Sequence, residues 1–245
     1  MRKEGPHANP AAIAFHLLLL PKTQLVKDED KMKKVAILGS GIVGQALARG
    51  FLKYGYDVVI GTQTPGKKID WQEPPANLPK VMTYEQAAQT ADVLVLAVKG
   101  TVAEDVARTA AVHAVGKTVI DATNPIAELP PENGVLRFFT SLDESLMERL
   151  QKLVPEAHFV KAFNSVGNAL MVNPDFGGIR PTMFICGNHE PAKQEVSALL
   201  NQFGWDTEDM GAVQAARAIE PLCMLWCIPG FAKNQWSHAF KLLKK

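Results

Sequence analysis

Residues 35–44 read Val-Ala-Ile-Leu-Gly-Ser-Gly-Ile-Val-Gly, and residues 58–62 read Val-Val-Ile-Gly-Thr. An apolar strand therefore runs into a glycine turn that opens a helix, and a second apolar strand follows. In this GxGxxG spacing Gly39 permits the tight turn, Gly41 leaves room for a pyrophosphate, and Gly44 lets the helix pack close to the strand. Since a helix N-terminus favours anions, the stretch predicts dinucleotide binding. The alternative is a tight turn without a ligand.

The composition is that of an ordinary globular protein, with 245 residues, 47% of them hydrophobic and 21% charged. A net charge of +1 predicts neither a nucleic-acid partner nor an anionic membrane surface. The three cysteines form no disulfide framework and no metal-ligand pattern; Cys223 and Cys227 are interpreted as small core residues of a helix. We therefore expect no metal site and a cytoplasmic setting.

The first 31 residues differ from the rest of the chain. The apolar run Ala11–Leu20 is too short to span a bilayer, and no small-residue cleavage site follows it. Met32 stands directly before the first predicted strand. We expect residues 1–31 to be an extension that is disordered or wrongly assigned to the chain, and residues 32–245 to form a single domain. A signal peptide or a membrane-surface helix is the alternative for the extension.

Apolar runs alternate with helical patterns, which is typical of a parallel sheet. The expected strands are 34–38, 57–60, 81–82, 92–98, 118–121, 158–163, 182–186 and 205–209. We predict a Rossmann-type, doubly wound α/β fold, with the last two strands extending a mostly parallel sheet. A C-terminal helical extension begins at about residue 211 and is interrupted near Pro221 and around Pro229.

Three helix starts are predicted from a Ser or Thr that is followed, three residues later, by Glu or Gln. In this capping box the two side chains satisfy free N–H groups of the first helical turn. The three pairs are Thr83 with Gln86, Thr101 with Glu104, and Ser141 with Glu144.

The end of the second strand bears on the choice between NAD and NADP. An NAD enzyme usually places Asp or Glu there to bind the ribose hydroxyl, but no acid occurs before Asp70. Thr62, Gln63, Thr64 and Lys67 supply hydroxyls, an amide and a positive charge instead. These residues favour the 2′-phosphate of NADP, and a solvated loop without a ligand is the alternative.

Three further strand ends supply candidate site residues, because ligands of a doubly wound sheet bind at the carboxyl ends of its strands. Ala97, Val98 and Lys99 are expected to lie along the cofactor. Asn124 and Pro125 would orient the nicotinamide ribose. The last strand end, with Ala162, Phe163, Asn164 and Ser165, suits a carboxamide or a flat ring. Local turn hydrogen bonds, loop capping and a solvated lysine are the alternatives.

These segments together resemble a known family. Gly39–Gly44, residues 58–62 and above all Val160–Ser165, which reads Val-Lys-Ala-Phe-Asn-Ser, are similar to the NADP-dependent oxidoreductases of the coenzyme F420-dependent family. The cytosolic NADPH-binding domains of STEAP-type metalloreductases share them. The resemblance covers about residues 33–210, and residues 220–226 resemble the corresponding segment of bacterial dinucleotide-binding members.

The resemblance implies an NADP(H)-dependent enzyme that transfers a hydride between the nicotinamide and a deazaflavin (coenzyme F420) or a flavin (FMN or FAD). NADP(H) would lie on Gly39, Ser40, Gly41, Ile42, Val43 and Gly44, with its nicotinamide near Ala162–Asn164. The family often has Arg after the Thr or Ser of the second strand end, whereas this chain has Thr62-Gln63. Thr62, Thr64 and Lys67 therefore become the main candidates for binding the 2′-phosphate. No catalytic side chain is required, because the cofactors carry the chemistry.

A pocket for the second substrate is predicted beside the nicotinamide. Its candidate residues are Asn164, Ser165, Met210, Leu222 and Trp226. The apolar members are also compatible with core or with the interface of a homodimer.

Two other functions stay open at this point. An imine or β-hydroxyacid reductase shares the same start but adds a larger helical domain, and only about 80 residues follow Phe163 here. A non-catalytic NADP sensor or partner-binding protein would keep the glycine turn without a substrate pocket. We expect a small-molecule redox co-substrate as the partner.

Overall fold

The computed structural model describes residue 1, residues 33–66 and residues 68–245, and every element below belongs to the unit Met32–Lys245. Most of the predicted extension at residues 1–31, and Lys67, lie outside these described residues. The main sheet has the order β3-β2-β1-β4-β5-β6, and all five pairs of neighbours are parallel. Its strands are β1 (Lys34–Leu38), β2 (Asp57–Gly61), β3 (Lys80–Met82), β4 (Val93–Leu96), β5 (Thr118–Asp121) and β6 (His158–Lys161). This confirms the predicted Rossmann-type fold.

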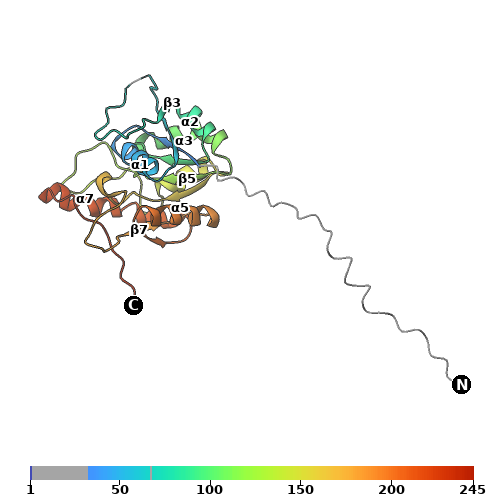
Figure 1. Cartoon of the computed structure of the whole chain (residues 1–245). Helices are drawn as coiled ribbons and strands as arrows, with labels where there is room; N and C mark the ends of the chain where they lie inside the picture. Colours follow the sequence, from blue (N-terminus) through green and yellow to red (C-terminus); the bar gives the residue numbers. More distant parts are fainter. Residues whose placement is uncertain (2–32, 67) are drawn as a thin grey trace. The chain divides into compact units, whose positions relative to one another are not determined.

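Helices cover both faces of this sheet, because successive strand residues point to opposite sides. Val35 and Ile37 pack toward α1 (Ile42–Lys53) and α5 (Glu190–Gln202). Ala36 and Leu38 pack toward the opposite layer, which includes three further helices of the main sheet. These are α2 (Tyr84–Thr90), α3 (Gly100–Ala114) and α4 (Leu146–Leu153), of which α2 and α3 lie side by side in Figure 1.

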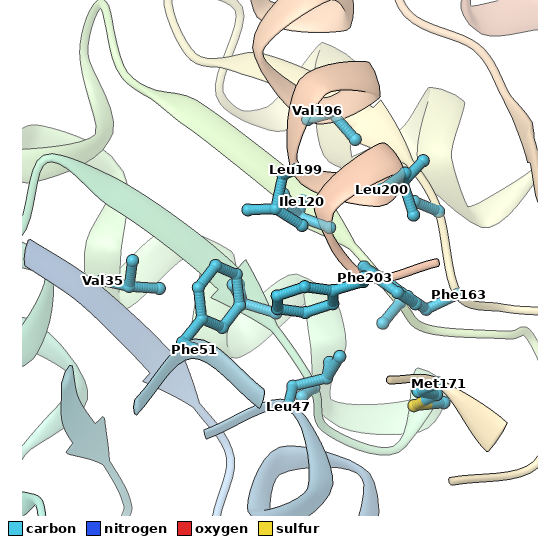
Figure 2. Packing of buried hydrophobic residues seen from close by; sticks show 14 of the residues in the cluster. Val35, Leu47, Phe51, Ile120, Phe163, Met171, Val196, Leu199, Leu200 and Phe203 are labelled. Atoms are coloured by element: carbon cyan, nitrogen blue, oxygen red, sulfur yellow. The ribbon is translucent and has the colours of Figure 1, made fainter. Parts of the chain in front are cut away.

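The core between the sheet and its α1–α5 face is built around aromatic rings. Figure 2 shows Phe51 of α1 beside Phe203, the residue that follows α5, and their ring centroids are 5.2 Å apart. Leu199 and Leu200 of α5 pack around the same rings. Burial of such side chains contributes roughly 1.5–3 kcal/mol each to the free energy of unfolding. This layer therefore holds α1 and α5 against the sheet.

The last two strands form a sheet of their own, so the prediction that they extend the main sheet is wrong. β7 (Thr182–Ile185) and β8 (Asp206–Asp209) pair in parallel with each other. Contact with β6 is an isolated antiparallel bridge between Lys161 and Cys186. The chain after β7 therefore runs against β6, with Gly187 so close that a Cβ there would lie 2.5 Å from the carbonyl oxygen of Phe159.

One of the three predicted capping boxes is confirmed and two are wrong. Thr83 caps α2 as predicted. The helix α3 begins one residue before Thr101, with Lys99 as its N-cap and no side-chain cap bond. The box of α4 is formed by Ser145 with the glutamate three residues later, whereas Ser141 takes part in an isolated bridge. The same residue pattern thus recurs four positions along, and only its second copy opens a helix.

The C-terminal segment consists of the short helix α6 (Ala216–Ile219) and the helix α7 (Leu222–Lys233). Pro221 separates them as predicted, but Pro229 lies inside α7, so the interruption predicted there is wrong. After α7 the chain returns to the second sheet, where the Thr182 N–H donates to the carbonyl of Phe240 over 2.8 Å. Within the described ranges, no helix combines the length and apolar character needed to cross a membrane.

Candidate functional site

The parallel strands of the main sheet all end at one edge, and the chain reverses its direction of travel across the sheet between β1 and β4. Gly39 joins the strand ends at this point. Its N–H donates to the carbonyl of Gly61 over 3.0 Å, and a Cβ on it would lie 2.2 Å from the carbonyl oxygen of Ala97. Its φ of +133° also favours glycine. The crevice that binds ligands in doubly wound sheets therefore opens at this turn.

The other two glycines have different surroundings. A Cβ on Gly44 would lie 2.0 Å from the carbonyl oxygen of Gly39, so only glycine lets α1 approach the turn. A Cβ on Gly41 would meet no atom of the described chain within 4 Å, so the space above this residue is open. Gly41 is the N-cap of α1, whose first turn has no acidic residue and no side-chain cap bond. Space, free N–H donors and the helix dipole here fit a pyrophosphate.

A cleft of about 620 Å³ continues from the turn along the ends of β4 and β5. It is lined by Val43, Val98, Lys99, Gly100, Thr101, Ala122, Thr123, Asn124, Ile126, Ala127, Glu128 and Leu129. Four of the predicted cofactor residues are among them, whereas Ala97 is buried and Pro125 follows the lining residue Asn124. Lys99 points largely into solvent, and its ammonium lies 3.5 Å from Glu128.

Gly100 is a site residue that sequence reasoning missed. A Cβ on it would lie 2.0 Å from the carbonyl oxygen of Asn124, so α3 begins in direct contact with the loop after β5. A glycine two residues after the most apolar predicted strand was the available signal. The N-termini of α1 and α3 thus both adjoin the cleft, and neither has an acidic first turn.

The end of β2 lies next to the glycine turn. The hydroxyl oxygens of Ser40 and Thr62 are 3.5 Å apart, which joins the two loops at the predicted 2′-phosphate position. Gln63 and Thr64 are exposed beside them, and Lys67 lies outside the described residues. The hydroxyls and the exposed loop fit an anionic group in contact with water.

A buried amide that was not predicted holds this region together. The Gln45 Nε2 atom donates to the carbonyls of Ser40 and Asp70, each over 3.1 Å. The Gln45 Oε1 atom accepts from the Gln72 N–H over 3.3 Å. The long loop after β2 is thereby tied to the glycine turn by one side chain. A single polar residue on the apolar face of a predicted helix was the signal for it.

Two asparagines link the ends of β5 and β6. The Asn124 Nδ2 atom donates to the Asn164 carbonyl over 2.8 Å, and the Asn164 Nδ2 atom donates to Asn124 Oδ1 over 3.2 Å and to the Ile219 carbonyl over 2.9 Å. Asn164 Oδ1 is buried and has no hydrogen-bond partner in the described part of the chain. An unpaired buried acceptor is costly, so this atom is suited to a ligand donor. Ser165 is buried beside this pair in the chain.

Phe163 contributes through its backbone. Its φ is +63°, a value that is rare for a bulky side chain and costs on the order of 1–3 kcal/mol. Its ring lies in the core, 6.2 Å from that of Phe203 (Figure 2), and Ala162 before it is fully buried. The ring therefore points away from the predicted nicotinamide position, and the strained turn is what directs Asn164 and Ser165 along the edge.

A buried ion network lies beneath these loops and was not predicted. The Lys161 ammonium contacts Asp121 Oδ2 at 2.6 Å and Glu220 Oε1 at 2.9 Å, and it donates to the Thr123 carbonyl over 3.0 Å. Burial lowers the pKa of this ammonium, but the two carboxylates outweigh it and hold the pKa above its usual value. A lysine inside an apolar strand pattern was the only signal, and it did not identify the partners.

The predicted second-substrate residues are only partly brought together. Trp226 of α7 is buried against the loop after β6, because a Cβ on Gly167 would lie 2.7 Å from the indole. Leu222 begins the same helix and is partly exposed. Met210 follows β8 in the second sheet, where its N–H donates to the Ile185 carbonyl over 2.8 Å. Trp226 thus lies near the Asn164–Ser165 turn, whereas Met210 belongs to a different part of the fold.

Comparison with known proteins bears on this site. Residues 34–125 match the model of the family described as NADP oxidoreductase, coenzyme F420-dependent. Metalloreductase STEAP3 of Rattus norvegicus is 31% identical over 201 residues, which cover 80% of this chain and 38% of that protein. Metalloreductase STEAP2 of Homo sapiens is 29% identical, with 80% and 37% covered. This chain therefore spans little more than a third of the length of these relatives.

A solved structure covers more of the fold. A proposed F420-dependent NADP-reductase from Arthrobacter sp. FB24 superimposes with a TM-score of 0.77 at 29% sequence identity, covering 86% of this chain and 100% of that one. The resemblance inferred from the glycine turn and from Val160–Ser165 is thereby confirmed.

Proposed function

We propose that the chain is a coenzyme F420-dependent NADP oxidoreductase, the family whose model residues 34–125 match, and that it transfers a hydride between NADP(H) and a flavin or deazaflavin. The observation that carries the proposal is the open space above Gly41, which adjoins the cleft at the ends of β4 and β5. An extended dinucleotide needs such a continuous path, with donors for its phosphates at one end and an apolar, amide-lined wall at the other.

The residues at the edge divide the binding task among them. The N-terminus of α1 at Gly41 would hold the pyrophosphate. Ser40, Thr62 and Thr64, together with Lys67, would hold the 2′-phosphate. Asn124 would orient the nicotinamide ribose, and Asn164 Oδ1, unpaired within the described ranges, offers an acceptor to the carboxamide. The bound cofactor supplies the hydride, and the protein supplies position and electrostatics.

The second substrate is proposed to lie beside Asn164 and Ser165, with α7 as a neighbouring wall. Ser165 and Trp226 are buried close to this turn, and Leu222 lies at the start of the helix. A flat redox ring is the class of acceptor that stacks against a nicotinamide without any proton donor from the protein. The chain's own part is to hold the two rings together and to exclude water from between them.

The proposal is tested by a substrate screen. NADPH and NADH are each incubated with FMN, FAD and the deazaflavin coenzyme F420, and loss of the reduced nicotinamide absorbance is followed. We expect turnover with at least one acceptor and a preference for NADPH. Tight binding of NADPH without reduction of any acceptor would refute the enzymatic function and leave a sensor.

The placement of the pyrophosphate has its own test. Gly41→Val adds a side chain where the protein has free space and where the φ of −75° is unstrained, so the melting temperature should be unchanged. Affinity for NADPH should fall by about 100-fold or more, because the branched side chain occupies the phosphate position. An unchanged dissociation constant would contradict the assignment of the turn.

A further inference from the structure

The C-terminal segment reaches the carboxyl edge through Glu220, which lies outside the residues that carry the family match. This residue stands between α6 and α7, and its carboxylate is buried. One oxygen contacts Lys161 at 2.9 Å, and the two oxygens accept the N–H groups of Leu146 and Met147, each over 3.0 Å. Glu220 therefore joins the end of β6, the start of α4 and the two C-terminal helices.

The same junction holds the asparagine pair. The residue before Glu220 is Ile219, whose carbonyl accepts from Asn164 Nδ2 over 2.9 Å. On the other side of the ammonium, the Thr123 carbonyl lies one residue before Asn124. Displacement of the Lys161–Glu220 contact would therefore move the backbone next to both asparagines.

We propose that Lys161 and Glu220 are positioning residues, which set the Asn124–Asn164 pair for the nicotinamide half of the cofactor. The inference rests on the proposed function, because it assigns that half of NADP(H) to the two asparagines. The ammonium lies within 3.0 Å of three oxygen atoms, on Asp121, Glu220 and Thr123, and these contacts on three segments restrict its position. Buried ion networks often add little net stability compared with apolar packing, and in some proteins they fix a unique geometry.

A second ion pair provides a matched control. Arg217 of α6 contacts Glu148 of α4 with three hydrogen bonds, the shortest of 2.6 Å. It therefore docks the same C-terminal segment on the same helix as Glu220 does. Its described contacts do not include Lys161 or either asparagine. Arg217→Met loosens the docking, and Glu220→Gln weakens the positioning while keeping the side-chain shape and an acceptor for one of the two α4 N–H groups.

The experiment compares the affinity of each protein for NADPH and for 2′-phospho-ADP, which has the pyrophosphate but lacks the nicotinamide riboside. We expect wild type to bind NADPH at least about 10-fold more tightly. Glu220→Gln should reduce this ratio to within about 2-fold, and lower kcat by about 100-fold, because misplacement by an ångström has effects of that size. Arg217→Met should keep both the ratio and kcat, even if its melting temperature falls.

Several outcomes overturn the inference. They are a wild-type ratio near one, a Glu220→Gln protein with the wild-type ratio and kcat, and equal losses in both variants. The double variant Lys161→Met/Glu220→Gln adds a further test, since two residues that act through one alignment should lower the ratio no more than either change alone. A wild-type protein that binds NADPH but reduces no acceptor refutes the hydride transfer, and the affinity ratio then still decides the positioning role.

Discussion

The two edges of the main sheet both have a cavity, but they differ in how far their polar groups are paired within the protein. At the amino edge, a space of about 450 Å³ lies between the strand starts and α5. Its polar groups bind one another: Thr118 donates to Glu195 over 2.6 Å, Lys33 also contacts Glu195, and Tyr56 donates to Gln202 over 3.1 Å. This edge is a satisfied surface.

The carboxyl edge has features that a fold alone does not require. Three glycines there have neighbours that exclude a Cβ at 2.0–2.2 Å, namely Gly39, Gly44 and Gly100. Asn164 keeps an acceptor that is unpaired among the described residues, and Phe163 has a left-handed φ. Backbone strain and unpaired buried acceptors are frequent at functional sites, where a ligand can use them. The comparison teaches that unmet bonding capacity, more than volume, separates a ligand site from a packing defect.

The largest effect is expected at Gly44. In Gly44→Ala the new methyl carbon would lie 2.0 Å from the carbonyl oxygen of Gly39, so α1 must move away from the sheet. We expect a loss of about 3 kcal/mol or more in the free energy of unfolding, measured in urea, together with loss of NADPH binding. The contrast with the stable Gly41→Val protein separates the two roles, and a Gly44→Ala protein as stable as wild type would contradict the packing assigned to this turn.

Much of the main sheet was predictable because its signals are local. Apolar runs, the glycine turn and the box at Thr83 each lie within a few residues, and they located β1, α1 and α2. Pairing between distant strands has no such signal, so the separation of β7 and β8 from the main sheet was missed. A capping pattern is equally compatible with a loop, which is why Ser141 was chosen in place of Ser145.

The site was predictable to the extent that strand ends meet at one edge. That rule brought Val98, Asn124 and Asn164 together correctly in space. It did not reveal that the ring of Phe163 turns into the core, because the direction follows from its unusual backbone conformation. Nor could it pair Lys161 with Glu220, which are 59 positions apart in the sequence. Contacts of that kind depend on where the C-terminal helices pack against the main sheet, and no local sequence pattern predicts that position.

An intermediate effect is expected at the amino edge. Glu195→Ala removes the acceptor of both Thr118 and Lys33, which should lower the free energy of unfolding by about 1–2 kcal/mol. NADPH affinity and turnover should stay at the wild-type level, because this cavity lies at the opposite edge from the glycine turn. The exposed neighbour Gln194→Ala serves as the control and should change stability by less than about 0.5 kcal/mol. Loss of NADPH binding in Glu195→Ala would show that the two edges are coupled.

The smallest effect is expected from a stacked histidine pair near the start of β6. The rings of His158 and His189 lie 3.6 Å apart, and His189 Nδ1 accepts from the Ala192 N–H at the start of α5. Burial, and then the charge of His189, lower the pKa of His158. The folded protein therefore binds fewer protons than the unfolded chain, so stability is fully present above the ordinary histidine pKa of about 6.5 and falls as the pH drops below it.

Urea unfolding at pH 8 and pH 5 measures this dependence. Because the His158 ring is only partly buried and water screens its interactions, wild type should lose less than about 1 kcal/mol from this pair between the two values. His158→Gln removes the titrating ring and should show a smaller loss over the same range. Parallel losses in the two proteins would mean that the stacked pair is not the titrating group. Because the pair stands at the start of β6, away from the glycine turn, the ratio of NADPH affinities of the two proteins should be the same at both pH values.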